Sequence, residues 1–233
     1  MDNISNYETY LFISFKKLII SVNTDSDKEI YHEELFINED LRLQNFVKLD
    51  YFLNQNIFKI EKKLQNFVEK ITIIIDLDIF FPVEISVKKN NYNDYINLKN
   101  LNHLLYEAKE TCKKTIYQKK IIHMLINNYQ INDKSYSFLP KDIKCQSYSL
   151  DLKLICIPEN FVRDLEVILK KYHISINHIL SASYLKNFSS SEELGIFSLA
   201  KKMINGLNPN EVVFKDKTLK NQGFFEKFFN FFN

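Results

Sequence analysis

The sequence is poor in glycine, and this scarcity excludes several kinds of nucleotide-binding site. Only three glycines occur among 233 residues: Gly195, Gly206 and Gly223. A P-loop and a dinucleotide-binding fingerprint both need clustered glycines, because the backbone must approach phosphate closely. The chain has no such cluster and no serine–histidine–aspartate pattern, so familiar nucleotide-binding and hydrolase motifs are excluded.

Charge and cysteine content also exclude broad classes. The formal net charge is only +2, and no basic block with interleaved aromatic residues indicates a nucleic-acid groove. The cysteines lack the spacing of metal ligands or of a redox pair. We therefore interpret them as reduced thiols in a cytosolic protein: Cys112, Cys145 and Cys156.

Long apolar runs and a basic leader are also absent. The chain starts with Asp2 and Glu8 where a signal peptide has positive charge, so no signal peptide is expected. No apolar run approaches the length that spans a bilayer. Any membrane contact must therefore come from the surface side.

A few polar residues remain as candidate sites. Asp76 and Asp78 are two positions apart at the end of a predicted strand and so share a face. Such a pair can bind a metal or act as acid and base. No third ligand or nucleophile accompanies it, which favours simple solvation of the strand end. The histidines have no zinc-like spacing and are interpreted as structural: His103, His123, His173 and His178.

The first third of the chain predicts a meander followed by a helix. Residues 10–15, 18–22 and 29–36 are typical of strands. A helix is predicted at about 50–69 with Asp50 as its N-cap. Its buried face comprises Leu53, Ile57, Ile60, Leu64 and Phe67. The apolar run at 71–75 suits a strand buried on both sides.

The remainder predicts a second, inserted unit and a return to the first sheet. Strands at 83–87, 120–131 and 150–157 enclose a short helix at 98–108, giving a strand–helix–strand–strand unit. A helix then opens at Pro158, followed by a strand at 175–180 and a short helix at 182–188. A last helix at 192–205 is closed by Gly206 as C-cap.

The final eleven residues predict an amphipathic helix. Six phenylalanines fall within about 160° of arc at helical spacing, and they are the candidate membrane-binding residues: Phe224, Phe225, Phe228, Phe229, Phe231 and Phe232. The helix either docks on the protein's own core or lies in a membrane surface. Between residues 211 and 227, four lysines face three acidic residues, so apolar burial and not charge dominates.

Several stretches resemble FtsA, the actin-like membrane anchor of the bacterial division ring. Residues 120–133 are similar to the family's hairpin in its inserted subdomain. Residues 150–157, 174–180 and 182–184 resemble the segment that returns to the first actin-like subdomain, and the phenylalanine-rich tail resembles the family's terminal helix. The resemblance implies an α/β fold: half of an actin/ribonuclease-H-like fold with an inserted subdomain and a C-terminal amphipathic helix.

The departures from the family concern nucleotide binding. Phe12, Ser14 and Phe15 stand where the family has the aspartate, glycine and threonine of its first phosphate loop. The second glycine-rich loop and the second actin-like half do not follow residue 188. We therefore expect no enzyme activity and no cofactor. The missing half also carries the family's FtsZ contact, which puts direct FtsZ binding in doubt.

The resemblance implies a cell-division scaffold on the inner face of the cytoplasmic membrane. Its expected partners are the membrane surface and division proteins or its own copies, bound through the inserted subdomain. The alternative is a PilM-like adaptor of a pilus or secretion system. The expected domains are 1–80 and 153–206 for the actin-like subdomain, 81–152 for the insertion, 207–222 for a linker and 223–233 for the terminal helix.

Overall fold

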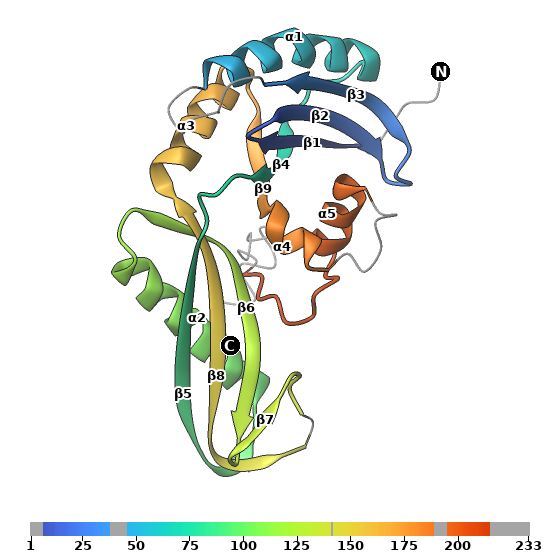
Figure 1. Ribbon diagram of the computed structural model, residues 1–233. Helices are drawn as coiled ribbons and strands as arrows, with labels where there is room; N and C mark the ends of the chain where they lie inside the picture. The colour runs from blue at the N-terminus through green and yellow to red at the C-terminus, as the bar shows by residue number, and fades with distance from the viewer. Residues whose placement is uncertain (1–6, 38–45, 141, 189–194, 215–233) are drawn as a thin grey trace, which may run out of the picture.

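The computed structural model describes residues 7–37, 46–140, 142–188 and 195–214 (Figure 1). These residues form two β-sheets joined end to end, with helices on both faces of the first sheet and on one face of the second. The predicted terminal helix and its six phenylalanines lie outside the described residues.

The first sheet has five strands. They are β1 (Tyr7–Ser14), β2 (Lys17–Thr24), β3 (Glu29–Phe36), β4 (Lys70–Asp76) and β9 (Ser175–Ser181). The order is β3-β2-β1-β4-β9, antiparallel through the meander and parallel from β1 to β9. The near-continuous apolar sequence of β4 fits its central place, because both of its faces are covered.

One face of this sheet is covered by α1 (Val47–Leu64) and α3 (Glu159–Lys170). Figure 1 shows α1 above the strands and α3 to their left. Alternation along β1 turns Leu11 and Ile13 into this core. The opposite face is covered by two shorter helices.

Those two helices are α4 (Ala182–Lys186) and α5 (Ile196–Ile204). They pack on Tyr10 and Phe12, the β1 residues of opposite parity to the first core. Helix α5 ends in a C-terminal motif in which Gly206, with φ +91°, takes the left-handed conformation that glycine adopts most readily.

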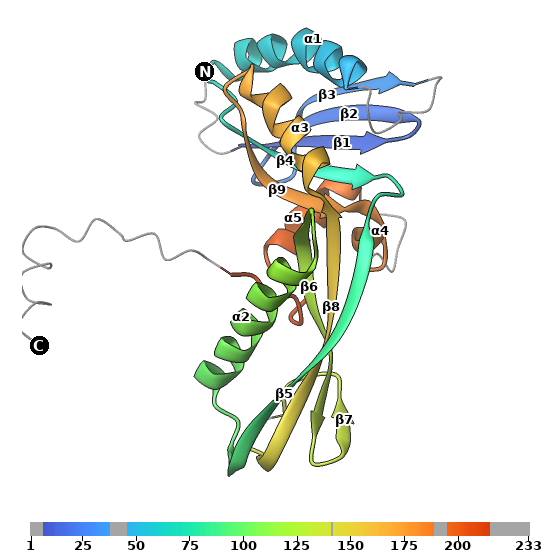
Figure 2. The same cartoon turned by 90° about the vertical axis from the view of Figure 1, so that its left-hand side faces the viewer.

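The second sheet is inserted between β4 and α3. It comprises β5 (Phe81–Tyr95), β6 (Lys119–Ile131), β7 (Lys134–Tyr136) and β8 (Lys144–Pro158), in the order β5-β8-β6-β7. All pairs are antiparallel. Helix α2 (Leu98–Thr115) packs on one face only, which Figure 2 shows beside the long strands.

The strand order and the position of the insertion confirm the predicted fold class. A three-stranded meander extended by two parallel strands, with helices on both faces, is half of an actin/ribonuclease-H-like fold. The inserted unit contains one strand more than predicted, because β7 forms a short hairpin with β6. Strand β8 runs unbroken through the predicted domain boundary after residue 152.

The predicted limits of α1 were wrong at both ends. The helix begins before Asp50, which therefore is not the N-cap; its carboxylate instead accepts hydrogen bonds from Lys171 at 2.7 Å and Tyr172 at 2.9 Å. The helix ends at Leu64, because Gln65 adopts a left-handed conformation. Phe67 consequently leaves the buried face and is 74% exposed.

Candidate functional site

The parallel strands deliver their carboxyl ends to one edge of the first sheet, where α/β folds commonly bind ligands. A cavity of about 920 Å³ lies at this edge. Its lining comes from the ends of β1 and β4, from α4, and from the adjoining ends of β5 and β8. The two sheets therefore both contribute to it.

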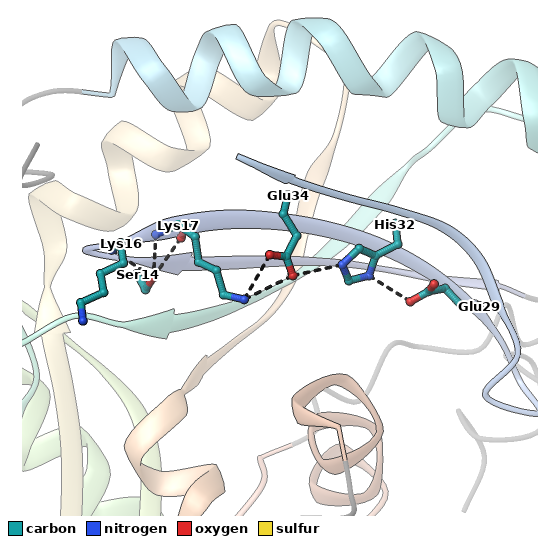
Figure 3. Close-up of polar contacts among 6 residues, drawn as sticks. All are labelled: Ser14, Lys16, Lys17, Glu29, His32 and Glu34. Atoms are coloured by element: carbon teal, nitrogen blue, oxygen red, sulfur yellow. Dashed lines mark hydrogen bonds and ion pairs between the residues drawn. The ribbon is translucent and has the colours of Figure 1, made fainter. Parts of the chain in front are cut away.

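The turn after β1 is closed by its own serine. The Ser14 hydroxyl accepts hydrogen bonds from the backbone amides of Lys16 at 3.3 Å and Lys17 at 3.1 Å. It also donates to the Lys17 carbonyl at 3.0 Å. Figure 3 shows the hydroxyl inside the turn, so the amides that would hold a phosphate oxygen are already engaged.

An ion-pair chain extends from this turn along the exposed side of the meander. Lys17 contacts Glu34 at 3.2 Å, and His32 bridges Glu34 at 3.3 Å and Glu29 at 2.9 Å (Figure 3). The hydrogen bond from His32, reinforced by Lys17, holds the pKa of Glu34 below its usual value. Lys17 is thus paired with a carboxylate of β3 at the mouth of the turn.

The cavity walls are largely aromatic. Phe12 is almost fully buried at the back, whereas Phe15 and Phe36 are substantially exposed at the mouth. The rest of the apolar lining comes from Leu77, Phe80, Pro82 and Ile155.

The predicted aspartate pair lies at this cavity. Asp76 and Asp78 both line it, and Asp76 forms an ion pair with Lys186 at 2.9 Å. Across the described ranges, no cluster of three or more histidine, cysteine or acidic side chains is arranged to hold a metal.

The actin-like fold implies a magnesium–nucleotide complex at this edge, and the residues present do not fit one. A phosphate needs free amide donors, and magnesium needs carboxylate or water oxygens in an open octahedron. Here the Ser14 hydroxyl accepts from two of the turn's amides, and Phe12 and Phe15 supply neither charge nor an oxygen ligand.

A buried polar network lies beside the cavity, where the two sheets meet. The Ser181 amide donates to Nε2 of His123 at 3.2 Å, so Nδ1 carries the proton and donates to Glu211 at 2.7 Å. The Tyr184 hydroxyl donates to the other Glu211 oxygen at 2.8 Å and accepts from Asn208 at 2.9 Å. Burial raises the pKa of Tyr184, and the bond to Glu211 adds to that shift.

This network fixes the segment that leads away from α5. The Ile126 amide donates to the Asn210 carbonyl at 2.9 Å, and the Val212 amide donates to Met124 at 2.8 Å. The segment thereby pairs with the edge of β6. Farther on, Phe214 lies under the Lys109 ammonium at 4.2 Å. The predicted linker at 207–222 therefore starts with residues that are packed, at least through Phe214.

Sequence reasoning did not assign this network, because its members are far apart in the chain. His123 was interpreted as structural, which agrees with its satisfied position. Glu211 was counted only as one acidic charge near the tail. The position of His123 within the apolar run of β6 could have predicted a buried hydrogen-bond partner for it, because buried polar groups are hydrogen-bonded.

The other predicted positions are dispersed. His103 forms an exposed pair with Glu107 at 3.3 Å, and His173 lies at positive φ after α3. His178 is half-buried in β9, and burial lowers its pKa. The three cysteines are buried and free.

Comparison with known proteins identifies no family for this chain. No family model matches the sequence, and no curated protein matches it either. Among solved structures, the PilM–PilN type IV pilus biogenesis complex is similar over 79% of this chain and 49% of that one, at 9% identity and a TM-score of 0.46.

Two further solved structures are similar to much of the chain. The cytoplasmic domain of EpsL, an inner membrane component of the Vibrio cholerae type II secretion system, matches 77% of this chain and 57% of its own, at 10% identity and a TM-score of 0.36. A Bacteroides thetaiotaomicron protein of actin-like ATPase fold and unknown function matches 84% and 61%, at 12% identity and a TM-score of 0.33. The chain thus spans about half to three-fifths of these structures' lengths.

The actin-like half-fold is assigned from the strand order and the inserted sheet. Closer kinship with FtsA stays a prediction. Within the part of the chain that is described, no helix has the length and apolarity needed to cross a bilayer.

Proposed function

We propose that this protein is a non-enzymatic scaffold of actin-like fold, tethered to the inner face of the cytoplasmic membrane by residues 223–233. The favoured setting is FtsA-like cell division. A PilM-like adaptor role in pilus or secretion assembly is the alternative. In that role the protein would also act as a scaffold, but it would bind a different partner.

The observation that carries the non-enzymatic assignment is the closed turn after β1. The amides of Lys16 and Lys17 are hydrogen-bonded to the Ser14 hydroxyl, and the aromatic rings of Phe12 and Phe15 line the cavity next to the turn. A scaffold needs surfaces that bind its partners and an attachment that holds it in place. Neither requirement depends on nucleotide binding at the carboxyl ends of β1 and β4. Titration calorimetry with Mg–ATP is expected to show no heat of binding; micromolar binding would contradict the assignment.

The tethering assignment combines the phenylalanine pattern with the packing of residues 208–214 against the folded body. Each buried phenylalanine contributes about 1.5–3 kcal/mol of transfer free energy, less the cost of ordering the helix. The Glu211 network ties the residues just before the tail to both sheets. The described part of the chain that precedes the predicted membrane-binding residues is therefore attached to the folded body.

Co-sedimentation with anionic phospholipid vesicles tests the tether. The full chain is expected in the pellet, and a 1–222 truncation in the supernatant. Phe228→Asp combined with Phe229→Asp should behave like the truncation. Asn230→Asp is the matched control, because it adds charge on the polar side of the predicted helix and should leave binding intact. Equal sedimentation of the full chain and the truncation would refute membrane tethering.

Cellular location separates the two settings. A fluorescent fusion at mid-cell supports division, and foci at the poles support the pilus adaptor. The inserted subdomain is the partner surface in either setting.

A further inference from the structure

The two edges of the second sheet are protected very differently. On one side, β7 pairs with the end of β6, and residues 210–212 pair with its middle. On the other side, β5 is the last strand, and no strand in the described ranges pairs with its outer edge. Figure 2 shows β5 running along the length of the sheet. A long open edge of this kind is a template for pairing with another strand.

The exposed edge is regular only over its first half. Pro82 has no amide hydrogen and limits pairing at one end. At the other end the register with β8 shifts after Asn90, where Tyr92 and Asn93 have positive φ. The stretch available for an added strand is therefore residues 83–89, and Ser86 stands at its centre.

The two faces of this stretch have distinct chemistry. Val83, Ile85 and Val87 are half-buried and pack against the core under α2. On the opposite face, Glu84 and Lys88 are exposed. Neither of the two charged side chains forms an ion pair or hydrogen bond with any other described residue.

Two of the three pairs of positions symmetric about Ser86 in this stretch are complementary, and the third places Val83 opposite Lys89. We propose that β5 pairs antiparallel with β5 of a second copy, joining the two inserted sheets into one eight-stranded sheet. With Ser86 on the two-fold axis, Glu84 lies opposite Lys88 of the other copy, and the symmetry gives two such pairs. Ile85 lies opposite Val87 on the apolar face, again twice.

The charge pattern favours a second copy over an unrelated strand. A one-residue slip would place an apolar side chain on the polar face of the joint sheet. A two-residue slip would remove the Glu84–Lys88 pairing. The stretch therefore specifies one register with its own copy, and in that register the half-buried valines and isoleucine lose their remaining contact with water.

This dimer deepens the proposed scaffold function by naming the copy that the inserted subdomain binds. It would also place two tails on one particle, which strengthens membrane binding by avidity. Its test needs no membrane, so a failed dimer and a failed tether are told apart.

Cross-linking through the axis is the sharpest test. In an antiparallel pair, the Cα atoms of opposed residues lie about 4.5–5.5 Å apart, within the range that a disulfide spans. Ser86→Cys in the full chain is expected to form a covalent dimer under mild oxidation. Asn90→Cys is the control: the two copies of position 90 would lie about 27 Å apart along the joint sheet and should not cross-link.

Charge reversal tests the register in solution by sedimentation equilibrium. Glu84→Lys is expected to weaken the dimer about tenfold or more, because two attractive pairs become two repulsive ones. Lys88→Glu added to it should restore the dimer. A wild-type chain that stays monomeric at high micromolar concentration would overturn the proposal. So would Ser86→Cys and Asn90→Cys cross-linking equally, or a reversed pair that fails to recover while its circular dichroism is unchanged.

Discussion

Replacing Glu211 by alanine is expected to destabilise the fold far more than an ordinary glutamate substitution. The Glu211 side chain is only 13% exposed and accepts hydrogen bonds from His123 and Tyr184. Alanine leaves both donors without an acceptor in a buried place. Each orphaned buried donor costs about 1–3 kcal/mol, so the loss of both should lower the free energy of unfolding by roughly 2–6 kcal/mol.

The chain contains a matched control in a second glutamate–histidine pair. Glu107 and His103 lie at 3.3 Å on α2, with side chains 60% and 63% exposed. Such a pair contributes about 0–1 kcal/mol, so Glu107→Ala should change stability little. Urea unfolding measures the difference directly. By calorimetry, about 3 kcal/mol in a protein of this size lowers the Tm by roughly 6–12 °C.

Tyr184→Phe completes the test by removing one donor and keeping the ring. If Glu211 acts through the network, the effects of Glu211→Ala and Tyr184→Phe should be non-additive by about 0.5–3 kcal/mol. Equal losses for Glu211→Ala and Glu107→Ala would refute the reasoning, because the buried acceptor would then contribute no more than a solvated one.

Two further predictions follow from buried titratable groups. Burial lowers the pKa of His178, so the unfolded chain binds a proton at higher pH than the folded one. The free energy of unfolding should therefore fall as the pH drops below about 6.5, and His178→Gln should reduce this slope in urea titrations from pH 7.5 to 5. Burial raises the pKa of all three thiols, that of Cys156 to about 11. An aromatic disulfide reagent at pH 8 should label none of them in the folded protein and all three in denaturant; rapid labelling of the native chain would contradict their burial.

The sequence was sufficient for the order of the elements because the signals are local. Apolar runs and alternation marked the meander, β4 and β9 without tertiary information. The length of β5 was missed because only Val83, Ile85 and Val87 alternate with polar residues. Beyond them, residues 88–95 are mostly polar and are held in the strand by backbone pairing with β8.

The candidate site was predictable only at positions where the sequence differs from the phosphate loop of the family that it resembles. Phe12, Ser14 and Phe15 stood out against the resembled phosphate loop, and the structure places all three at the cavity. That the Ser14 hydroxyl would take the turn's amides depends on a side-chain rotamer. The Glu211 network depends on a contact across 88 positions with His123. No periodicity carries either kind of information.

The path of the chain after α5 explains how residues 208–212 come to contact the junction of the two sheets. Gly206 and Leu207 donate their amides back to Met203 and Lys202, and the left-handed glycine turns the backbone away from the helix. No atom lies within 4 Å of a Cβ added at Gly206, so conformation and not space selects glycine there. The turn sends residues 208–212 past Tyr184 and onto β6. Glu211 therefore fixes the chain to the junction of the two sheets at a point between α5 and Phe214, so a force on the chain after Phe214 would act on this junction first.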